Sequence, residues 1–242
     1  MTDLLSVEDV SKRFRGLLAV DNVSFRVARG SIFAVIGPNG AGKTTLFNII
    51  AGIFAPDRGS VDFAGERIDA LAPDEICRRG IGRTFQLVRP FPALSVEDNV
   101  VIGAMLRRHD PAAARRHARE VLARLDLFGK RHQPASALTL PDRKRLEVAR
   151  ALATEPKLLL LDEVMAGLRP AETDRMVSAL TELNREFGLT ILLIEHVMRA
   201  VMALAARVLV LHHGARIAEG APAAVVREPA VIQSYLGAEA VD

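Results

Sequence analysis

The chain begins with segments in which apolar and polar residues alternate. Between residues 4 and 35 such segments, among them residues 22–27, are separated by turn residues, and another at residues 60–63 follows a turn at residues 56–59. A period of two places successive side chains on opposite faces of a strand. The pattern therefore predicts a small, largely antiparallel sheet.

Continuous apolar runs interrupt this alternation and dominate the second half of the chain. They have the length of strands buried on both faces, and helix-like segments at residues 171–187 and 197–206 separate the later ones. The runs are residues 31–36, 158–161, 190–194 and 208–211. Buried strands that alternate with helices predict a parallel sheet covered by helices.

Residues 95–131 differ from both patterns, because alanine, arginine and leucine predominate and apolar residues recur at helical spacing. We interpret this region as a helical insertion. The whole chain, residues 1–242, is then a single domain, because no linker or internal repeat divides it. Its expected parts are a β-subdomain at about 1–30 and 56–70, a helical subdomain at about 88–150, and a C-terminal tail at about 220–242.

Composition narrows the class of protein. The 242 residues are 50% hydrophobic, enough for a large core, yet the apolar runs are far shorter than the roughly 18 residues that a spanning helix requires. No basic and apolar leader follows Met1, so we expect a cytoplasmic protein. Cys77 is the one cysteine, which excludes an intramolecular disulfide and a cysteine-based metal cage.

The charge does not indicate nucleic acid as a partner. The pI is 9.4, but the formal net charge is only +3, and arginine and lysine occur in short groups between acidic residues. Aromatic residues make up 5% of the chain and tryptophan is absent from the sequence, so aromatic side chains for base stacking are scarce. Solvated helix faces account for the basic groups better.

A glycine-rich loop supplies the strongest chemical signal. Residues 37–44 fit the pattern G-x-x-x-x-G-K-[ST] between an apolar strand and a segment that reads as a helix. Glycines let backbone N–H groups approach phosphate oxygens, and the helix N-terminus adds positive charge. Lys43 then suits the β and γ phosphates and Thr44 suits Mg²⁺. The predicted nucleotide-binding residues here are Gly37, Pro38, Asn39, Gly40, Ala41, Gly42, Lys43, Thr44 and Thr45.

Two carboxylates follow the apolar strand at residues 158–161. Asp162 and Glu163 should lie at the carboxyl edge of a parallel sheet, where ligands of such sheets bind. Asp162 can help to hold Mg²⁺, and Glu163 can orient and deprotonate an attacking water. Taken alone, the glycine-rich loop could be a chance turn between a strand and a helix. Taken alone, the two carboxylates could simply cap the next helix.

Together these motifs resemble the ATP-binding subunit of an ABC transporter, over essentially the whole chain. The resemblance implies an α/β P-loop NTPase of the ABC-ATPase type, with a parallel-sheet core, an antiparallel β-subdomain and a helical subdomain. It also implies that Gln86 senses the γ-phosphate and metal, and that His196 contacts the γ-phosphate. Phe14 resembles the aromatic residue that stacks on adenine, with Val20 as a neighbour; packing in the core is the alternative for Phe14.

The signature segment, which in this family touches the nucleotide of the partner subunit, departs from the usual Leu-Ser-Gly-Gly-Gln. It becomes Leu138-Thr139-Leu140-Pro141-Asp142. Pro141 lacks an N–H, Leu140 adds bulk, and Asp142 is expected to bring negative charge near the partner's γ-phosphate. We therefore expect slow hydrolysis at the composite site that uses this signature, or a faster site that uses a signature on a partner chain.

Several short segments, including residues 84–86, 94–100 and 231–237, resemble the corresponding segments of the branched-chain amino acid importer ATPases. Urea or amide, aromatic acid and lipopolysaccharide transport remain alternatives. The implied partners are two transmembrane permease subunits, a second ATPase subunit that is a related chain or a second copy, and indirectly a periplasmic binding protein. The implied location is the inner face of the cell membrane, with residues from Gln86 to about Val100 forming a groove for a permease helix.

Two rival interpretations stay open. A soluble P-loop kinase or regulatory NTPase would need an acceptor site, and it would not account for the order of Gln86 and His196. A nucleotide-binding module without hydrolysis is the other, and the unusual signature motivates it.

Overall fold

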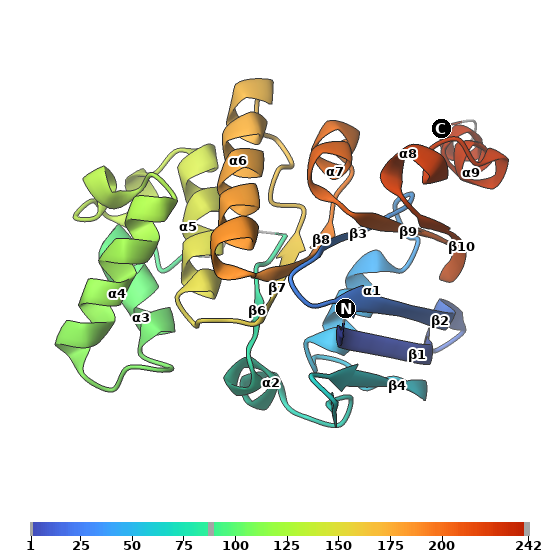
Figure 1. Cartoon of the computed structure of the whole chain (residues 1–242), viewed down its shortest axis with the longest axis horizontal. Helices are drawn as coiled ribbons and strands as arrows, with labels where there is room; N and C mark the ends of the chain where they lie inside the picture. The colour runs from blue at the N-terminus through green and yellow to red at the C-terminus, as the bar shows by residue number, and fades with distance from the viewer. Residues whose placement is uncertain (1, 87–89, 240–242) are drawn as a thin grey trace.

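The computed structural model describes residues 2–86 and 90–239, which form two sheets and the helices around them (Figure 1). The smaller sheet has the strand order β2-β1-β4-β5 and is antiparallel throughout, as the alternating pattern predicted. Its strands are β1 (Asp3–Phe14), β2 (Leu17–Ala28), β4 (Arg58–Phe63) and β5 (Glu66–Arg67). β1 and β2 are longer than their alternating segments, because they form one hairpin whose register shifts continue the pairing.

The larger sheet has the order β10-β9-β3-β8-β7-β6. The pairs from β9 to β6 are parallel, which confirms the predicted parallel core, and β10 pairs with β9 antiparallel. Its strands are β3 (Ile32–Ile36), β6 (Ile81–Arg83), β7 (Leu158–Asp162), β8 (Thr190–Ile194), β9 (Arg207–His212) and β10 (Ala215–Gly220). Because the central strands run the same way, all of their carboxyl ends lie at one edge of the sheet.

Both faces of the larger sheet are buried, which explains the continuous apolar runs. In β3, Ile32, Ala34 and Ile36 pack into one apolar core, whereas Phe33 and Val35 pack into a second core with the antiparallel sheet. Figure 1 shows the first face covered by a row of helices and the second by α1 and the antiparallel sheet. The row is α5 (Leu140–Leu152), α6 (Pro170–Phe187), α7 (Met198–Leu204), α8 (Pro222–Val225) and α9 (Pro229–Glu239).

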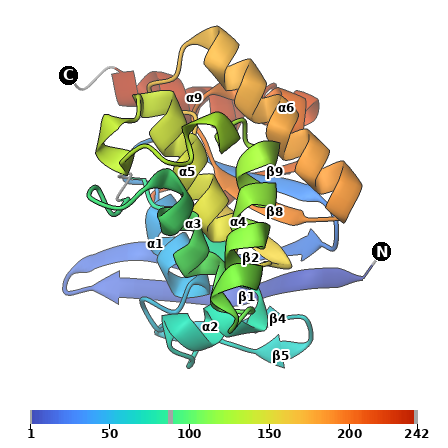
Figure 2. The same ribbon diagram turned by 90° about the vertical axis from the view of Figure 1, so that its left-hand side faces the viewer.

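The predicted helical insertion forms the end of the molecule that faces the viewer in Figure 2. α3 (Val96–Ala104) and α4 (Pro111–Arg124) pack against α5 there. Each begins at a polar cap, since Ser95 accepts from the amide of Asp98, and Asp110 accepts from the amides of Ala112 and Ala113. The arrangement places the amino end of α5 next to the carboxyl edge of the larger sheet.

The remaining helices are α1 (Lys43–Ile50) and α2 (Pro73–Arg79), with two short 3₁₀ turns at Phe128–Lys130 and Ala135–Ala137. The helix predicted at residues 197–206 is shorter, from Met198 to Leu204. Across residues 2–86 and 90–239, no helix is long and apolar enough to cross a membrane.

Candidate active site

The loop between β3 and α1 has the shape of a phosphate cradle. Gly37 and Gly42 both have positive φ, and a Cβ would lie 2.1 Å from the carbonyl oxygen of Leu211 at Gly37 and 2.3 Å from that of Ala19 at Gly42. Only glycine fits these two positions. α1 begins at Lys43, directly after the loop, so the positive end of this helix and its first N–H groups are available to an anion.

Lys43 lies inside this loop. Its Nζ donates to the carbonyl oxygens of Gly37, at 2.7 Å, and Pro38, at 2.8 Å. An ammonium has three donors, so one remains for a phosphate oxygen. Burial lowers the pKa of Lys43, and the nearby Glu163 and Asp162 carboxylates oppose that shift. The predicted contact between Lys43 and a nucleotide phosphate therefore has both the donor and the position that it needs.

The topology of the larger sheet brings the other predicted residues to the same place. β6, β7, β8 and β3 are neighbours. Gln86 follows β6, Asp162 and Glu163 stand at the end of β7, and His196 follows β8. Parallel neighbours end at the same edge, so residues far apart in the chain meet beside the phosphate loop, as ligands of open α/β sheets require.

Glu163 is the centre of this cluster. Gln86 Nε2 donates to Glu163 Oε2 at 2.9 Å, and His196 Nδ1 lies 3.9 Å from Glu163 Oε1. The backbone of Glu163 has a φ of 50°, which is uncommon for a residue with a side chain, and its amide donates to the carbonyl of Ile194 at 2.9 Å. The end of β8 thus fixes a turn that directs the carboxylate toward Gln86 and His196. The three predicted catalytic side chains form one group.

Asp162 is 1% exposed, and its environment fits a divalent cation. Arg83 Nη2 lies 3.5 Å from Asp162 Oδ2, whereas Oδ1 has no hydrogen-bond partner among the described residues. Burial raises the pKa of Asp162, with a further contribution from Glu163, although Arg83 opposes the shift. An unpaired carboxylate oxygen in a buried position is costly unless another group binds it.

The donor set suits Mg²⁺ bound with a nucleotide. Among the described residues, no group of three His, Cys, Asp or Glu side chains could hold a metal alone. Mg²⁺ usually takes one or two protein oxygens, with phosphate and water completing its shell. Thr44, in the first turn of α1, and Gln86 line one pocket together with Glu163, and Asp162 directly precedes Glu163 at the end of β7. The predicted ligands Thr44, Gln86 and Asp162 therefore remain a consistent set.

Four residues at this edge were not found from the sequence. Arg83 donates to Asn48 Oδ1 at 2.7 Å as well as approaching Asp162, and Thr84 Oγ1 accepts from the amide of Asp162 at 3.1 Å. Glu195 is buried and accepts from the amide of Met165 at 2.8 Å. The fourth is Lys144, whose ammonium donates to the carbonyl oxygen of Glu163 at 2.9 Å. β6 has three residues, too few for a periodic pattern, so the chain gave no strand to which Arg83 and Thr84 could be assigned.

A pocket of about 440 Å³ lies over the phosphate loop. Of the two residues predicted to contact adenine, Phe14 and Val20, the pocket's position agrees with Phe14. Phe14 lines it together with Ala19, Gly42 and Lys43, and packs edge-to-face on Phe54 at 5.1 Å. Val20, the expected neighbour, is 0% exposed and belongs to the apolar core. The strand alternation of β2 turns Val20 inward, so the expectation for Val20 is wrong and its neighbour Ala19 faces the pocket.

The signature segment begins α5. Pro141 lies in the first turn of the helix, which tolerates proline, and Leu140 is 42% exposed. A Cβ added to Gly167 would lie 3.3 Å from Leu140 Cδ2, so Leu140 rests beside the loop after Glu163. The bulky side chain thus occupies the surface where the family places glycine.

The expectation for Asp142 is wrong. Its carboxylate is 3% exposed, accepts from Lys130 and from Thr139 Oγ1, the latter at 2.8 Å, and lies 3.3 Å from Arg145 Nη2. Three donors hold it inside the chain, and the Thr139 hydroxyl turns toward it. The negative charge is therefore neutralised within this subunit and does not face a partner's nucleotide.

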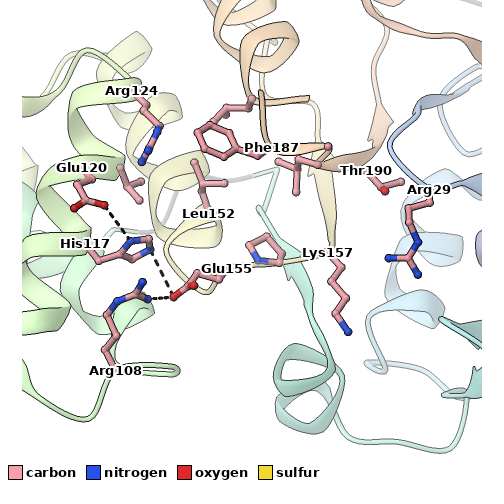
Figure 3. A pocket seen from close by; sticks show the side chains of 15 residues that line it. Arg29, Arg108, His117, Glu120, Arg124, Leu152, Glu155, Lys157, Phe187 and Thr190 are labelled. Atoms are coloured by element: carbon pink, nitrogen blue, oxygen red, sulfur yellow. Dashed lines mark ion pairs between the residues drawn. The ribbon is translucent and has the colours of Figure 1, made fainter. Parts of the chain in front are cut away.

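A cavity of about 570 Å³ lies at the opposite edge of the larger sheet, near the starts of β7 and β8 (Figure 3). On one side of it Arg108 pairs with Glu155, and His117 lies 3.8 Å from Glu120 and 3.9 Å from Glu155. The phosphate loop and the carboxylates lie at the other edge of the sheet. This cavity is therefore separate from the candidate active site.

Comparisons with known proteins bear on the family to which this chain belongs. A model of the family described as ABC transporter matches residues 20–166, and a model described as branched-chain amino acid ATP-binding cassette transporter matches residues 215–241. This chain is an ABC transporter ATPase. The first match spans the phosphate loop, Gln86, the signature segment and both carboxylates, which confirms the predicted family and fold class, and with them ATP binding and hydrolysis.

Relatives of this ABC ATPase extend the likeness over the whole chain. It is 38% identical over 249 residues to LivG of Salmonella typhimurium, a high-affinity branched-chain amino acid transport ATP-binding protein, covering 97% of this chain and 98% of LivG. An ATP-binding cassette solved in its ADP conformation is 31% identical, with a TM-score of 0.89 and coverage of 98% and 100%. A dimeric bacterial cassette is 25% identical, with a TM-score of 0.83 and coverage of 90% and 98%.

Proposed function

We propose that this ABC ATPase powers the import of branched-chain or other hydrophobic amino acids. The support is the C-terminal match at residues 215–241 to branched-chain amino acid cassettes, together with the likeness to LivG along nearly the full length of both chains. Other subunits of the transporter would select the cargo. The C-terminal match and the likeness to LivG therefore indicate the type of transporter to which this ATPase belongs, and the cargo only through that type.

The chemistry follows from the group around Glu163. The Glu163 carboxylate orients a water molecule for attack on the γ-phosphate and accepts its proton, and ADP leaves as the bond between the γ-phosphorus and the bridging oxygen breaks. Gln86 holds one carboxylate oxygen of Glu163, and His196 stands near the other. Lys43 and the amides of the phosphate loop bind the phosphates. Mg²⁺, held by Thr44, Gln86 and Asp162, would neutralise phosphate charge.

A second ATPase subunit completes the proposed site. The chain has one phosphate loop and one signature segment, and in this family the signature serves the nucleotide of the opposite subunit. The likeness to a dimeric cassette supports such a pair. The partner is a related chain or a second copy of this one.

Two permease subunits are the proposed membrane partners, with a periplasmic binding protein acting through them. Apolar side chains stay exposed near Gln86 and along α3, a surface that suits an apolar permease helix. They are Phe85, Phe91, Leu94, Ile102 and Met105. Residues 87–89 of the proposed groove lie outside the described residues. This docking would place the chain at the inner face of the membrane.

The substitution Glu163→Gln tests the hydrolytic assignment. In the assembled transporter it should lower ATP turnover by about 100-fold or more, because the proton acceptor is lost, while nucleotide affinity stays within about twofold. Glu182→Gln, at an exposed position of α6, is the matched control and should leave turnover unchanged. Equal turnover in wild type and Glu163→Gln would refute the role of Glu163.

Uptake of radiolabelled substrate by proteoliposomes tests the cargo. Leucine, isoleucine and valine should accumulate with ATP inside and the matching binding protein outside. Urea and aromatic acids should accumulate at less than about a tenth of that rate, a difference of roughly 1.4 kcal/mol in transition-state free energy. Preferred uptake of either alternative would replace the proposed cargo and leave the ATPase assignment intact.

A further inference from the structure

Lys144 links the signature helix to two catalytic segments of the same chain. It lies in α5, one turn after Leu140, and is 5% exposed. Its Nζ donates to the carbonyl oxygen of Glu163 at 2.9 Å and to that of Gln86 at 3.4 Å. One ammonium thus contacts the backbone of the proton acceptor and of its hydrogen-bond partner.

The burial of this ammonium is compensated by its surroundings. Burial lowers the pKa of Lys144, and the carboxylates of Glu195, Glu163, Asp162 and Glu147 act in the opposite direction. Two carbonyl oxygens and several carboxylates satisfy a charge that would otherwise be costly to bury. The position of the Lys144 ammonium is therefore set both by α5, which carries the residue, and by the carbonyls and carboxylates at the carboxyl edge of the larger sheet.

The contacts have a geometric consequence. Backbone carbonyls cannot rotate away as side chains do, so a displacement of α5 moves the donor of two hydrogen bonds at once. Glu163 has an unusual φ of 50°, a conformation that its surroundings must maintain. Gln86 and Glu163 also bond to each other at 2.9 Å. A small movement of α5 is thus transmitted to both.

We propose that Lys144 is a positioning residue for ATP hydrolysis, which couples the signature helix to the backbone of Gln86 and Glu163. Contact between α5 and the partner's nucleotide would thereby reach this subunit's own catalytic group. The coupling rests on the proposed composite site, whereas the positioning of Glu163 by Lys144 does not. A purely structural role, in which Lys144 only neutralises buried carboxylates, is the alternative.

Amide hydrogen exchange in the nucleotide-free subunit tests the positioning directly. Lys144→Met keeps the length of the side chain and removes its donors. We expect faster exchange in the peptides that contain Glu163 and Gln86, and unchanged exchange in α4. Lys157→Met is the matched control, because the Lys157 ammonium makes no hydrogen bond or ion pair to the described residues. Unchanged exchange at Glu163 and Gln86 would overturn the proposal, as would equal acceleration in α4.

Kinetics of the assembled transporter separate positioning from loss of stability. Lys144→Met should lower kcat by about tenfold or more and leave KM within about twofold, because the phosphate loop is untouched while the reacting geometry changes. Parallel losses in kcat, nucleotide affinity and unfolding temperature would show a structural role. If Lys144→Met does not fold, Lys144→Gln, which keeps an amide donor, takes its place with the same readouts.

A double substitution tests the coupling to the signature. The change in kcat caused by Leu140→Gly should be smaller in the Lys144→Met background than in wild type, since the link that transmits it is gone. Equal effects in both backgrounds would refute the coupling. A wild-type transporter that does not hydrolyse ATP would instead refute the proposed function, and the exchange experiment would still report on Lys144.

Discussion

Replacing Asp142 by asparagine should destabilise the fold instead of improving nucleotide binding. The carboxylate is the shared acceptor for Lys130, Thr139 and Arg145 at the start of α5. Asparagine keeps the shape but loses the charge, and its NH₂ group faces donors. The prediction distinguishes two positions of the Asp142 carboxylate. If it points into the subunit, as observed, the substitution lowers stability. If it pointed toward the partner's nucleotide, the substitution would instead remove repulsion of the γ-phosphate.

The magnitude follows from the exposure of each partner. Lys130 is 42% exposed, so solvent screens its pair with Asp142, and that pair contributes about 0.5 kcal/mol. Arg145 is better shielded, at 14% exposed, and its ion pair contributes about 1 kcal/mol after the part that asparagine retains. Thr139 is exposed, so its hydrogen bond contributes about 0.5 kcal/mol. The sum is about 2 kcal/mol, which lowers the unfolding temperature by about 4–8 °C in a chain of this length.

The assay is thermal unfolding of the isolated subunit followed by circular dichroism. Asp126→Asn is the matched control, because Asp126 also pairs with Arg145, at 3.2 Å, but is 89% exposed. It should change the free energy of unfolding by less than about 0.5 kcal/mol. A stability loss at Asp142 no larger than at Asp126, together with higher ATP turnover, would refute the inward position of the Asp142 carboxylate.

The same site predicts a pH dependence. Burial alone would raise the pKa of Asp142, but Lys130, Thr139 and Arg145 together hold this pKa below its ordinary value. The folded state therefore favours the ionised carboxylate. Its contribution is fully present above the ordinary pKa, about 3.9, and is lost as pH falls through the lower folded value. Wild type and Asp142→Asn should converge in stability below about pH 4.

The remaining predictions concern nucleotide contacts. Lys43→Ala should weaken ATP binding by about 10- to 100-fold, the loss expected for charge-assisted hydrogen bonds, as measured by titration with a fluorescent nucleotide; unchanged affinity and transport would refute the phosphate site. Phe14→Leu should weaken binding by about 0.5–1.5 kcal/mol if the ring stacks on adenine, and an unchanged Kd would favour core packing. Leu140→Gly combined with Pro141→Gly should raise ATP turnover of the assembled complex, because backbone N–H groups become accessible; no change would discard the idea of a weakened signature.

Local patterns in the sequence were sufficient for the elements and for the residues that meet the phosphates. Glycine spacing at residues 37–44 specifies a backbone that other residues cannot adopt, and the apolar runs specify strands buried on both faces. Asp162 and Glu163 follow directly from the end of such a run. Each of these features is formed by residues close together in the chain, so the spacing of residues in the sequence is enough to predict it.

Positions that depend on contacts between distant segments were mispredicted or missed. Val20 was misplaced because the face that a strand residue presents depends on register within β2, not on its apolar character. Asp142 was misplaced because Lys130 reaches it only after α5 packs against the earlier 3₁₀ turn that contains this lysine, whereas Arg145 lies one turn further along the same helix. Arg83 was missed because β6 has too few residues for a pattern.

The sequence by itself determined the phosphate loop, the carboxylate pair and the alternating strands and helices, because each is encoded by residues close together in the chain. The tertiary structure decided which side chains share an edge, and therefore which charges are neutralised and which are available. Gln86 and Glu163 are 77 positions apart and bond only because β6 and β7 are parallel neighbours. Lys144 reaches the carbonyls of both residues because they lie side by side at this edge of the sheet. A buried charge finds such partners through packing, and spacing along the chain does not reveal them.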